Sequence, residues 1–213
     1  MFDYFYNHSL RKLVVGFGSL FNNIQIAHTD PDTSSSTNIR VPIHYGPQEK
    51  FIQRLLQPSS ITPGTRIELQ VPVISFIMNS VASDPSRRLS RFPNQGGSCP
   101  TPQSQIPVNV SFSLLAYTRH TDDMLQIVEQ IMPYFLPDHV ITMDFTEGAG
   151  TNVNIPIVMV SNNLTEKYEG DLASRRLNIA SFQFIAKSWI FGEVRSTTSI
   201  QSVDTSGTNI IFD

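Results

Sequence analysis

The ten residues from Val108 to Tyr117, VNVSFSLLAY, decide the fold class of this chain. Apolar and polar side chains alternate along them, which is the period of a β-strand with one buried face. A strand this regular implies further strands to pair with, because a lone strand pair is barely stable in water. The face expected to be buried carries Val108, Val110, Phe112, Leu114 and Ala116.

Five further segments are rich in β-branched and aromatic residues and are expected to be strands. They cover residues 23–28, 39–45, 67–78, 154–162 and 177–191. Pro42 cannot donate a hydrogen bond to a ladder, so the strand that contains it is an edge or carries a bulge. The apolar side of the strand at 67–78 changes face between Val73 and Ile74, which indicates a bulge or cover on both sides.

Three segments have the period of amphipathic helices. The first follows an apolar stripe from Phe2 to Leu20, the second covers residues 47–56 and the third covers residues 122–132. Thr121 is expected to cap the third helix, and Pro133 is expected to end it. The stripe that this helix buries is expected to be Met124, Ile127, Val128 and Ile131.

These elements predict an α+β fold, a mostly antiparallel β-sheet with helices packed on one face, plus long loops. Residues 1–192 are expected to form a single domain, with a loop insertion at about 83–105 and a charged connection at 165–176. Residues 193–213 are expected to form a C-terminal extended arm that ends in Ile210, Ile211 and Phe212. A disordered tail rarely ends in three large apolar residues, so this arm either adds a strand to a neighbour's sheet or is a frayed terminus.

The composition excludes several classes of protein. Of the 213 residues only 15% are charged, against about 25% in an average soluble domain, which suits a surface covered by partners or by further copies. The net charge of −3 is not that of a dedicated nucleic-acid binder. One cysteine, Cys99, allows no internal disulfide and no cysteine-based zinc site. No apolar run is long enough to span a bilayer, and residues 1–18 lack the layout of a signal peptide.

The sequence carries no motif that would support catalysis, and no enzyme, cofactor or metal site is expected. The five histidines lie far apart and form no i, i+4 pair. There is no glycine-rich phosphate loop and no nucleophile elbow. The fold could still gather His44, His120 and Asp122, so a hydrolase that uses His120 with Asp122 or Asp123 stays open as an alternative.

The aromatic start of the chain has three interpretations. Tyr4, Phe5 and Tyr6 belong to a helix that packs its stripe on the core or to an exposed anchor for a partner protein. A membrane anchor comes third, because the polar face of the helix has few cations.

Several blocks of the sequence resemble one family in order and spacing. They are Met1–Asn7, Leu20–Ile26, Ile39–Ile43, Tyr117–Ile131 running on to Pro133–Phe135, and Ser174–Trp189. The family is the tail sheath stabiliser and completion protein of T-even-like, contractile-tailed phages. The resemblance covers most of residues 1–56 and 107–191, whereas about 57–106 show none.

The resemblance implies a structural protein of the virion, with no catalysis. Members form a homo-hexameric ring at the head-proximal end of the tail, the neck, after assembly in the host cytoplasm. The ring sits on the tail tube terminator, holds the last disc of the tail sheath protein extended, and offers a surface to the neck or connector proteins; DNA only passes through its channel. The alternative is the tube terminator itself, or another head–tail connector of the same phage type.

Within the matched blocks, two groups contain residues that a core does not require. One is the aromatic start, and the other is Arg119 with Asp122 and Asp123. Arg119 is expected to pair with a carboxylate of a neighbouring copy, and so are Arg175 and Arg176. With Ile210, Ile211 and Phe212, these residues are the interface candidates.

Overall fold

The computed structural model describes residues 4, 6–29, 36–47, 50, 71–87, 105–144, 152–168 and 176–191. In chain order its elements are α1 (Ser9–Leu20), β1 (Gln25–Thr29), β2 (Ser36–Arg40), β3 (Ile43–Tyr45), β4 (Val73–Ser83), η1 (Pro85–Arg87), β5 (Gln105–Thr118), α3 (Thr121–Ile131), η2 (Met132–Phe135), β6 (His139–Asp144), β7 (Asn152–Tyr168) and β8 (Arg176–Phe191). The η elements are short 3-10 turns. Of the described helices, none is long and apolar enough to cross a membrane.

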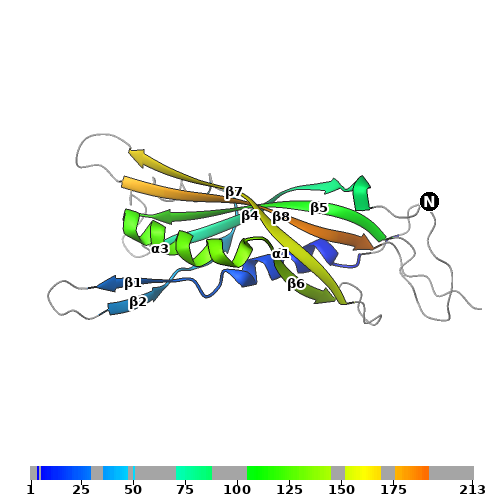
Figure 1. Cartoon of the computed structure of the whole chain (residues 1–213), viewed down its shortest axis with the longest axis horizontal. Coiled ribbons are helices and arrows are strands. Elements are labelled where there is room, and N and C mark those ends of the chain that lie inside the picture. Colours follow the sequence, from blue (N-terminus) through cyan, green and yellow to red (C-terminus); the bar gives the residue numbers. More distant parts are fainter. Residues whose placement is uncertain are drawn as a thin grey trace, which may run out of the picture.

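Six of the strands form one sheet in the order β3-β4-β5-β8-β7-β6. Every pair in it is antiparallel except β3 with β4. The segment VNVSFSLLAY lies in β5, which pairs along its length with β4 on one side and with β8 on the other. The expectation of a mostly antiparallel sheet is confirmed, and both helices lie along the sheet in Figure 1.

The alternation in β5 places its apolar set on the face that the helices cover. Phe112 stacks on Phe17 of α1 with ring centroids 4.3 Å apart, and Phe184 of β8 meets the same ring edge-on at 5.4 Å. Phe21 and Phe135 extend this aromatic cluster, which joins α1 and η2 to the sheet. The predicted stripe of α3 is confirmed, because Met124, Ile127, Val128 and Ile131 are all buried in the same core.

Two glycines allow helix α1 to lie close against the sheet. A Cβ atom on Gly18 would come within 2.6 Å of the Phe76 ring, and one on Gly16 would come within 2.9 Å of the Met143 methyl group. Any larger residue at position 18 would therefore push the helix away from the aromatic cluster, or push Phe76 out of its place. The glycines that weaken helix propensity are here a condition of packing.

Helix α1 is shorter than the stripe predicts. It begins at Ser9, and its N-cap, His8, has the left-handed backbone angle φ of 55°. Just before this turn, the Asn7 side-chain amide donates a hydrogen bond to the Phe191 carbonyl oxygen at 3.0 Å, which ties the start of the chain to the end of β8. The expected helical turn before residue 9 is therefore replaced by a tethered segment.

The third helix also differs from its prediction at both ends. The expectation that Thr121 caps α3 is wrong: His120 is the N-cap, with no side-chain capping bond, and Thr121 is the first helical residue. The Thr121 hydroxyl instead accepts a hydrogen bond from the Asn178 amide at 3.2 Å. Pro133 ends the α-helix as expected, and the chain continues into η2. The helix expected at 47–56 lies largely outside the described residues.

The strand expected at 39–45 is divided at Pro42. β2 pairs with β1 in a separate hairpin, whereas β3 joins the edge of the large sheet. The division is bridged by the backbone, since the Val41 amide donates to Ile24 and the Ile74 amide donates to the Pro42 carbonyl oxygen, both at 2.9 Å. Pro42 thus marks the step from one sheet to the other.

Other strands differ in extent from the prediction. β4 runs to Ser83, and its bulge lies between Met78 and Ser80. At the predicted change of face the strand has no bulge, and Val73 and Ile74 are both buried, so it is covered on both sides there. The described part of the loop insertion includes η1. β5 begins at Gln105, and β7 runs to Tyr168 through residues expected to be a charged connection. β6 was not predicted from the sequence. Residues 193–213 lie outside the described residues, so the arm stays a prediction.

We expect Phe17→Ala to lower the free energy of unfolding by about 3–5 kcal/mol, the usual cost of removing a buried phenylalanine. Phe17 is fully buried and contacts four other phenylalanines. Val15→Ala, on the exposed side of the same helix, is the control and should change the free energy by less than about 0.5 kcal/mol. Urea unfolding followed by circular dichroism measures both; equal effects would contradict this account of the core.

Candidate protein-interaction surfaces

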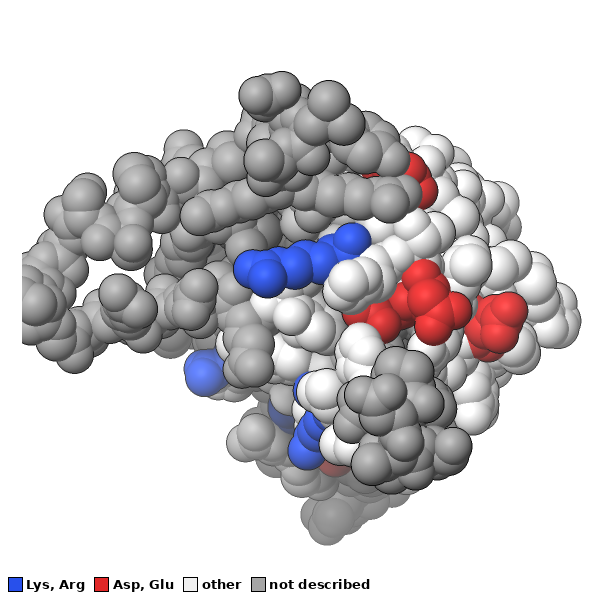
Figure 2. Space-filling model, turned by 90° about the vertical axis from the view of Figure 1, so that its left-hand side faces the viewer, with Lys and Arg blue, Asp and Glu red and all other residues white. Residues whose placement is uncertain are grey.

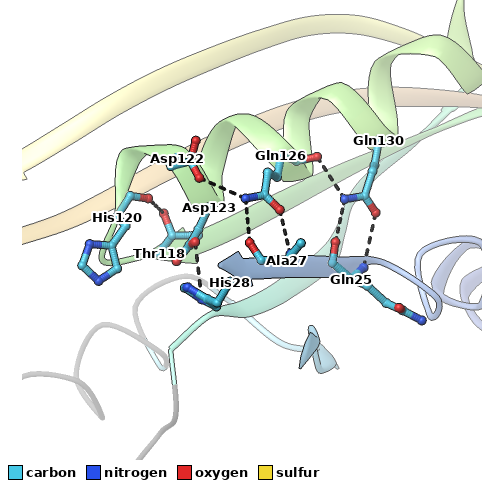
Figure 3. A network of polar contacts seen from close by, with 9 residues as sticks. All are labelled: Gln25, Ala27, His28, Thr118, His120, Asp122, Asp123, Gln126 and Gln130. Carbon is cyan, nitrogen blue, oxygen red and sulfur yellow. Dashed lines mark hydrogen bonds and ion pairs between the residues drawn. The ribbon is translucent and has the colours of Figure 1, made fainter. Parts of the chain in front are cut away.

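Two glutamines of α3 attach the β1–β2 hairpin to the body of the chain (Figure 3). Gln126 accepts a hydrogen bond from the Ala27 amide at 2.8 Å and donates to the Ala27 carbonyl oxygen at 3.2 Å. Gln130 does the same with Gln25, accepting from its amide at 3.3 Å and donating to its carbonyl oxygen at 2.6 Å. Each carboxamide thus bonds to β1 as a neighbouring peptide group would.

The spacing explains why this arrangement, the glutamine clamp, works. Residues four apart on a helix lie about 6 Å apart along its axis, and residues two apart on a strand lie about 7 Å apart. Gln126 and Gln130 therefore lie opposite Ala27 and Gln25, the two residues of β1 whose backbone N–H and C=O groups point away from β2. The edge of β1 that would otherwise be open is closed by side chains of α3.

An acidic corner lies where α3 begins, next to the hairpin. Asp123 is only 4% exposed, and its Oδ1 lies 3.5 Å from Nε2 of His28 on β1. Asp122 is exposed and accepts a hydrogen bond from the Gln126 amide at 3.1 Å. Asp123 therefore holds the hairpin against the helix, whereas Asp122 presents its carboxylate at the surface.

Arg119 is exposed at the same corner, directly before α3. Among the described residues it has no ion-pair partner. Figure 2 views the end of the molecule at which α3 begins, and acidic side chains gather there on one part of the described surface, beside cations. The corner therefore exposes side chains of both signs, and the contact of Arg119 and Asp122 with a partner stays a prediction.

Tyr4 and Tyr6 of the aromatic start are exposed rather than packed in the core. Tyr4 is 94% exposed and Tyr6 is 55% exposed, and the Tyr6 ring lies 4.1 Å from the His8 ring. For these two residues the exposure argues against packing in the core, and contact with a partner stays a prediction. Tyr4 and Tyr6 lie before α1, whose own stripe is buried.

The remaining interface candidates cannot be placed. Phe5, Arg175, Ile210, Ile211 and Phe212 lie outside the described residues, and Arg176 begins β8 but its side chain is not described. Their roles stay predictions.

The sheet face that lies opposite the helices carries a line of short polar side chains. Asn79 donates to the Ser113 hydroxyl, which donates to Gln183 Oε1 at 2.8 Å, so the line crosses β4, β5 and β8. Ser80 and Ser111 add a further contact at 3.2 Å. These are the polar positions of the alternation in β5, and they present donors and acceptors instead of charges.

Arg87 forms an ion pair just after β4 and links this point to β5 by hydrogen bonds. Arg87 donates from Nε to Asp84 Oδ2 at 2.7 Å and from Nη2 to the Val108 carbonyl oxygen at 2.9 Å. Its guanidinium also lies over the Trp189 ring, 5.4 Å from the centroid. Hydrogen bonds from the Ser86 side chain and then from Arg87 lower the pKa of the Asp84 carboxyl group from 3.8 to about 2.

The described residues do not bring a catalytic site together. They contain no group of three histidine, cysteine, aspartate or glutamate side chains that could hold a metal ion. His120 serves as the backbone N-cap of α3, where its carbonyl oxygen accepts a hydrogen bond from the Thr118 hydroxyl at 3.1 Å. His44 lies on β3, in another part of the sheet.

Sequence reasoning missed a groove between α1 and β6. Its volume is about 500 Å³, and its walls include Arg11, Lys12 and Val15 from α1 and Thr142, Met143 and Asp144 from β6. In the structure, the side chains of residues 139–144 alternate between half-buried and exposed. The sequence carries only a weak signal of this alternation, because a segment of six residues with a polar residue at each end resembles a loop.

Comparison with known proteins places these surfaces in context. A family model described as T4-like virus Myoviridae tail sheath stabiliser matches residues 4–210. The tail completion protein gp15 of Enterobacteria phage T4 is 32% identical over 204 residues, which cover 91% of this chain and 74% of that relative. The matched residues include the exposed tyrosines, the acidic corner and the groove.

We expect the double substitution Gln126→Ala and Gln130→Ala to loosen the hairpin while leaving the sheet intact. Each glutamine makes two hydrogen bonds to β1, so losing one glutamine should cost about 1–2 kcal/mol of local stability. Hydrogen exchange at the Gln25 and Ala27 amides should then become at least about tenfold faster. Glu129→Ala, exposed on the same helix, is the control; unchanged exchange at β1 in the double variant would refute the clamp.

We expect Asp84 to titrate near pH 2 in a carbon-detected NMR titration. Because its folded pKa lies below the ordinary value of 3.8, the ionised carboxylate stabilises the fold above pH 3.8, and this contribution is lost as the pH falls through about 2. Ser86→Ala removes the largest cause of the shift and should move the midpoint upward, whereas Ser80→Ala should not. An Asp84 midpoint near 3.8 in the parent chain would contradict the contacts described.

Proposed function

Because the chain belongs to the T4-like Myoviridae tail sheath stabiliser family, as its sequence blocks predicted, we propose that it forms a ring of six copies at the head-proximal end of a contractile tail. A chain of this family is a structural component of a phage tail, which implies contacts with other tail components and a place in the virion. The finer proposal is that the ring caps tube and sheath, holds the last sheath disc extended, and gives the neck proteins their docking surface. The same proposal includes assembly of the ring in the cytoplasm of the host cell.

The observation that carries the proposal is the family match over residues 4–210. The surface of the chain supports it, because an assembly protein needs several separate contact areas on one rigid body. The aromatic start, the acidic corner with Arg119 and the polar sheet face lie on different elements of the fold. Polar faces of this kind suit wide, hydrated contacts.

We propose that the ring stabilises the sheath by thermodynamic linkage between ring binding and the extended state. A ring that binds the extended sheath and not the contracted sheath stabilises the extended state by the free energy of that binding. At a free concentration one hundred times the dissociation constant, one such contact contributes about 2.7 kcal/mol. Six contacts made by one ring act together, so the ring resists contraction more strongly than six separate chains would.

The acidic corner is the proposed contact between copies. Arg119 is exposed and Asp122 presents a carboxylate nearby, so each copy could offer the cation to one neighbour and the carboxylate to the other. A contact between two different surfaces is heterologous, and such contacts close into rings when the rotation between copies allows it.

We expect the purified chain to bind the ends of extended tails, at a ratio of six copies per end. Labelled protein, counted per tail after sedimentation, measures this ratio. Naked tubes without sheath are the comparison that separates a sheath stabiliser from a tube terminator. Equal binding to naked tubes would favour the terminator, and binding along the whole tail or none at its ends would contradict the proposal.

Arg119→Glu should weaken ring formation by at least about tenfold, since it places like charges together at the proposed contact. Lys50→Glu, a charge reversal at another exposed cation, is the control for the loss of a cation. Light scattering on the parent chain should approach six times the chain mass of 23.9 kDa as the concentration rises. An unchanged mass distribution for Arg119→Glu would remove this residue from the interface.

A further inference from the structure

Within the described part of the chain, β6 is an edge strand of the large sheet. Among the described strands its partner is β7 alone, so one row of its backbone amides and carbonyl oxygens has no ladder partner there. Its sequence, HVITMD, contains neither the proline nor the lysine that commonly protects an edge strand from pairing. Val140 is exposed on it. An edge of this kind accepts an added strand readily.

The groove lies directly beside this edge. Its α1 wall places the apolar Val15, which is 66% exposed, between β6 and the solvent. Gly16 lets Met143 approach the helix closely, so the floor of the groove is apolar. Side chains that alternate along an added strand would therefore point into an apolar slot on one face.

The groove carries two cations, Arg11 and Lys12, against one carboxylate, Asp144, so the balance of charge at its rim is positive. Arg11 is exposed, and Lys12 reaches across to donate to the Asp144 carbonyl oxygen at 3.2 Å. His8 lies at the same rim. An extended segment that combines alternate apolar side chains with a negative charge would match this surface in hydrogen bonding, apolar contact and charge.

We propose that the groove and the free edge of β6 receive residues 206–213 of a neighbouring copy as an added strand, an inference that rests on the ring proposed above. These residues read SGTNIIFD and contain one acid and no cation. Ile210 and Phe212 are two apart, so in a strand both point to the same face, which is the apolar slot. Asp213 follows them toward the basic rim.

The place where the segment leaves the fold supports the same occupant. β8 ends at Phe191, and 22 residues follow it (213 − 191). Fully extended, they reach up to about 70 Å, which is enough to cross to an adjacent copy. Asn7, one residue before the groove residue His8, binds the Phe191 carbonyl oxygen, so the donor segment starts at the rim of its own acceptor groove.

The joint would be heterologous, because the donor segment and the acceptor groove are different parts of each copy. Each copy would give its last residues to one neighbour and take those of the other. Every joint in the ring would then run in the same direction, from the donor segment of one copy to the acceptor groove of the next.

Two variants that each lack one half of the joint test the proposal. Deletion of residues 206–213 leaves an acceptor without a donor. Arg11→Glu with Val15→Glu leaves a donor whose groove repels it, and both positions are exposed, so the fold should persist. Each variant alone should stay monomeric in light scattering, whereas their equimolar mixture should give a complex with twice the mass of one chain.

The matched control is Leu125→Glu, which adds the same residue at an exposed position of α3, and it should assemble like the parent chain. No complex in the mixture would overturn the proposal, and so would an unchanged oligomer of the deleted chain alone. If the synthetic peptide SGTNIIFD binds the deleted chain but the parent chain stays monomeric, the segment occupies its own groove, which also overturns assignment to a neighbour.

The mixing experiment is independent of sheath binding. A complex in the mixture, together with failure of the parent chain to bind tail ends, would reject the proposed function and keep the strand exchange. Normal binding of the deleted chain to tail ends, at six copies per end, would reject the strand exchange and keep the proposed function.

Discussion

The stack of Phe17 on Phe112 fixes how helix α1 lies on the sheet, and the contact surfaces depend on that position. Phe112 points toward the helices because it holds an even position in the alternation of β5, and a shift of one residue in register would turn it to the other face. Gly18 and Gly16 permit the close approach. With the helix fixed in this way, its N-terminal part reaches the edge of β6 and forms one wall of the groove.

A second attachment positions the hairpin, and it is polar rather than apolar. The glutamine clamp closes the edge of β1, and the Asp123–His28 contact adds a partly buried pair at the start of α3. Hydrogen bonds at an exposed edge contribute less than a buried aromatic cluster, so the hairpin should open locally before the sheet does. The charged corner and the hairpin can thus adjust to a partner while the aromatic core stays rigid.

The low content of charged residues is what we expect of a tail protein whose surface is covered by partners. Short polar side chains on the sheet face offer hydrogen bonds without the desolvation cost of buried ions. Charged side chains lie at the corner and at the rim of the groove, among other places, and there they can select a partner and its orientation. Membership of the tail sheath stabiliser family supplies the setting in which such surfaces are used.

The sequence by itself determined β5, the buried stripe of α3 and the family. The first two are set by a local period of burial, and family blocks such as Tyr117–Ile131 are contiguous residues. It also predicted that the strand with Pro42 is an edge or carries a bulge, because proline lacks an amide hydrogen, whereas the division of that strand into β2 and β3 came from the structure.

Only the tertiary structure decided that β6 is an edge among the described strands, that Gln126 meets Ala27 across 99 residues, and that Asp123 is buried while Asp122 is not. These features depend on contacts between segments that are far apart in the sequence, and the local repeat of apolar residues does not predict such contacts. The start of α1 was misjudged for the same reason, since the bond from Asn7 to Phe191 spans 184 residues.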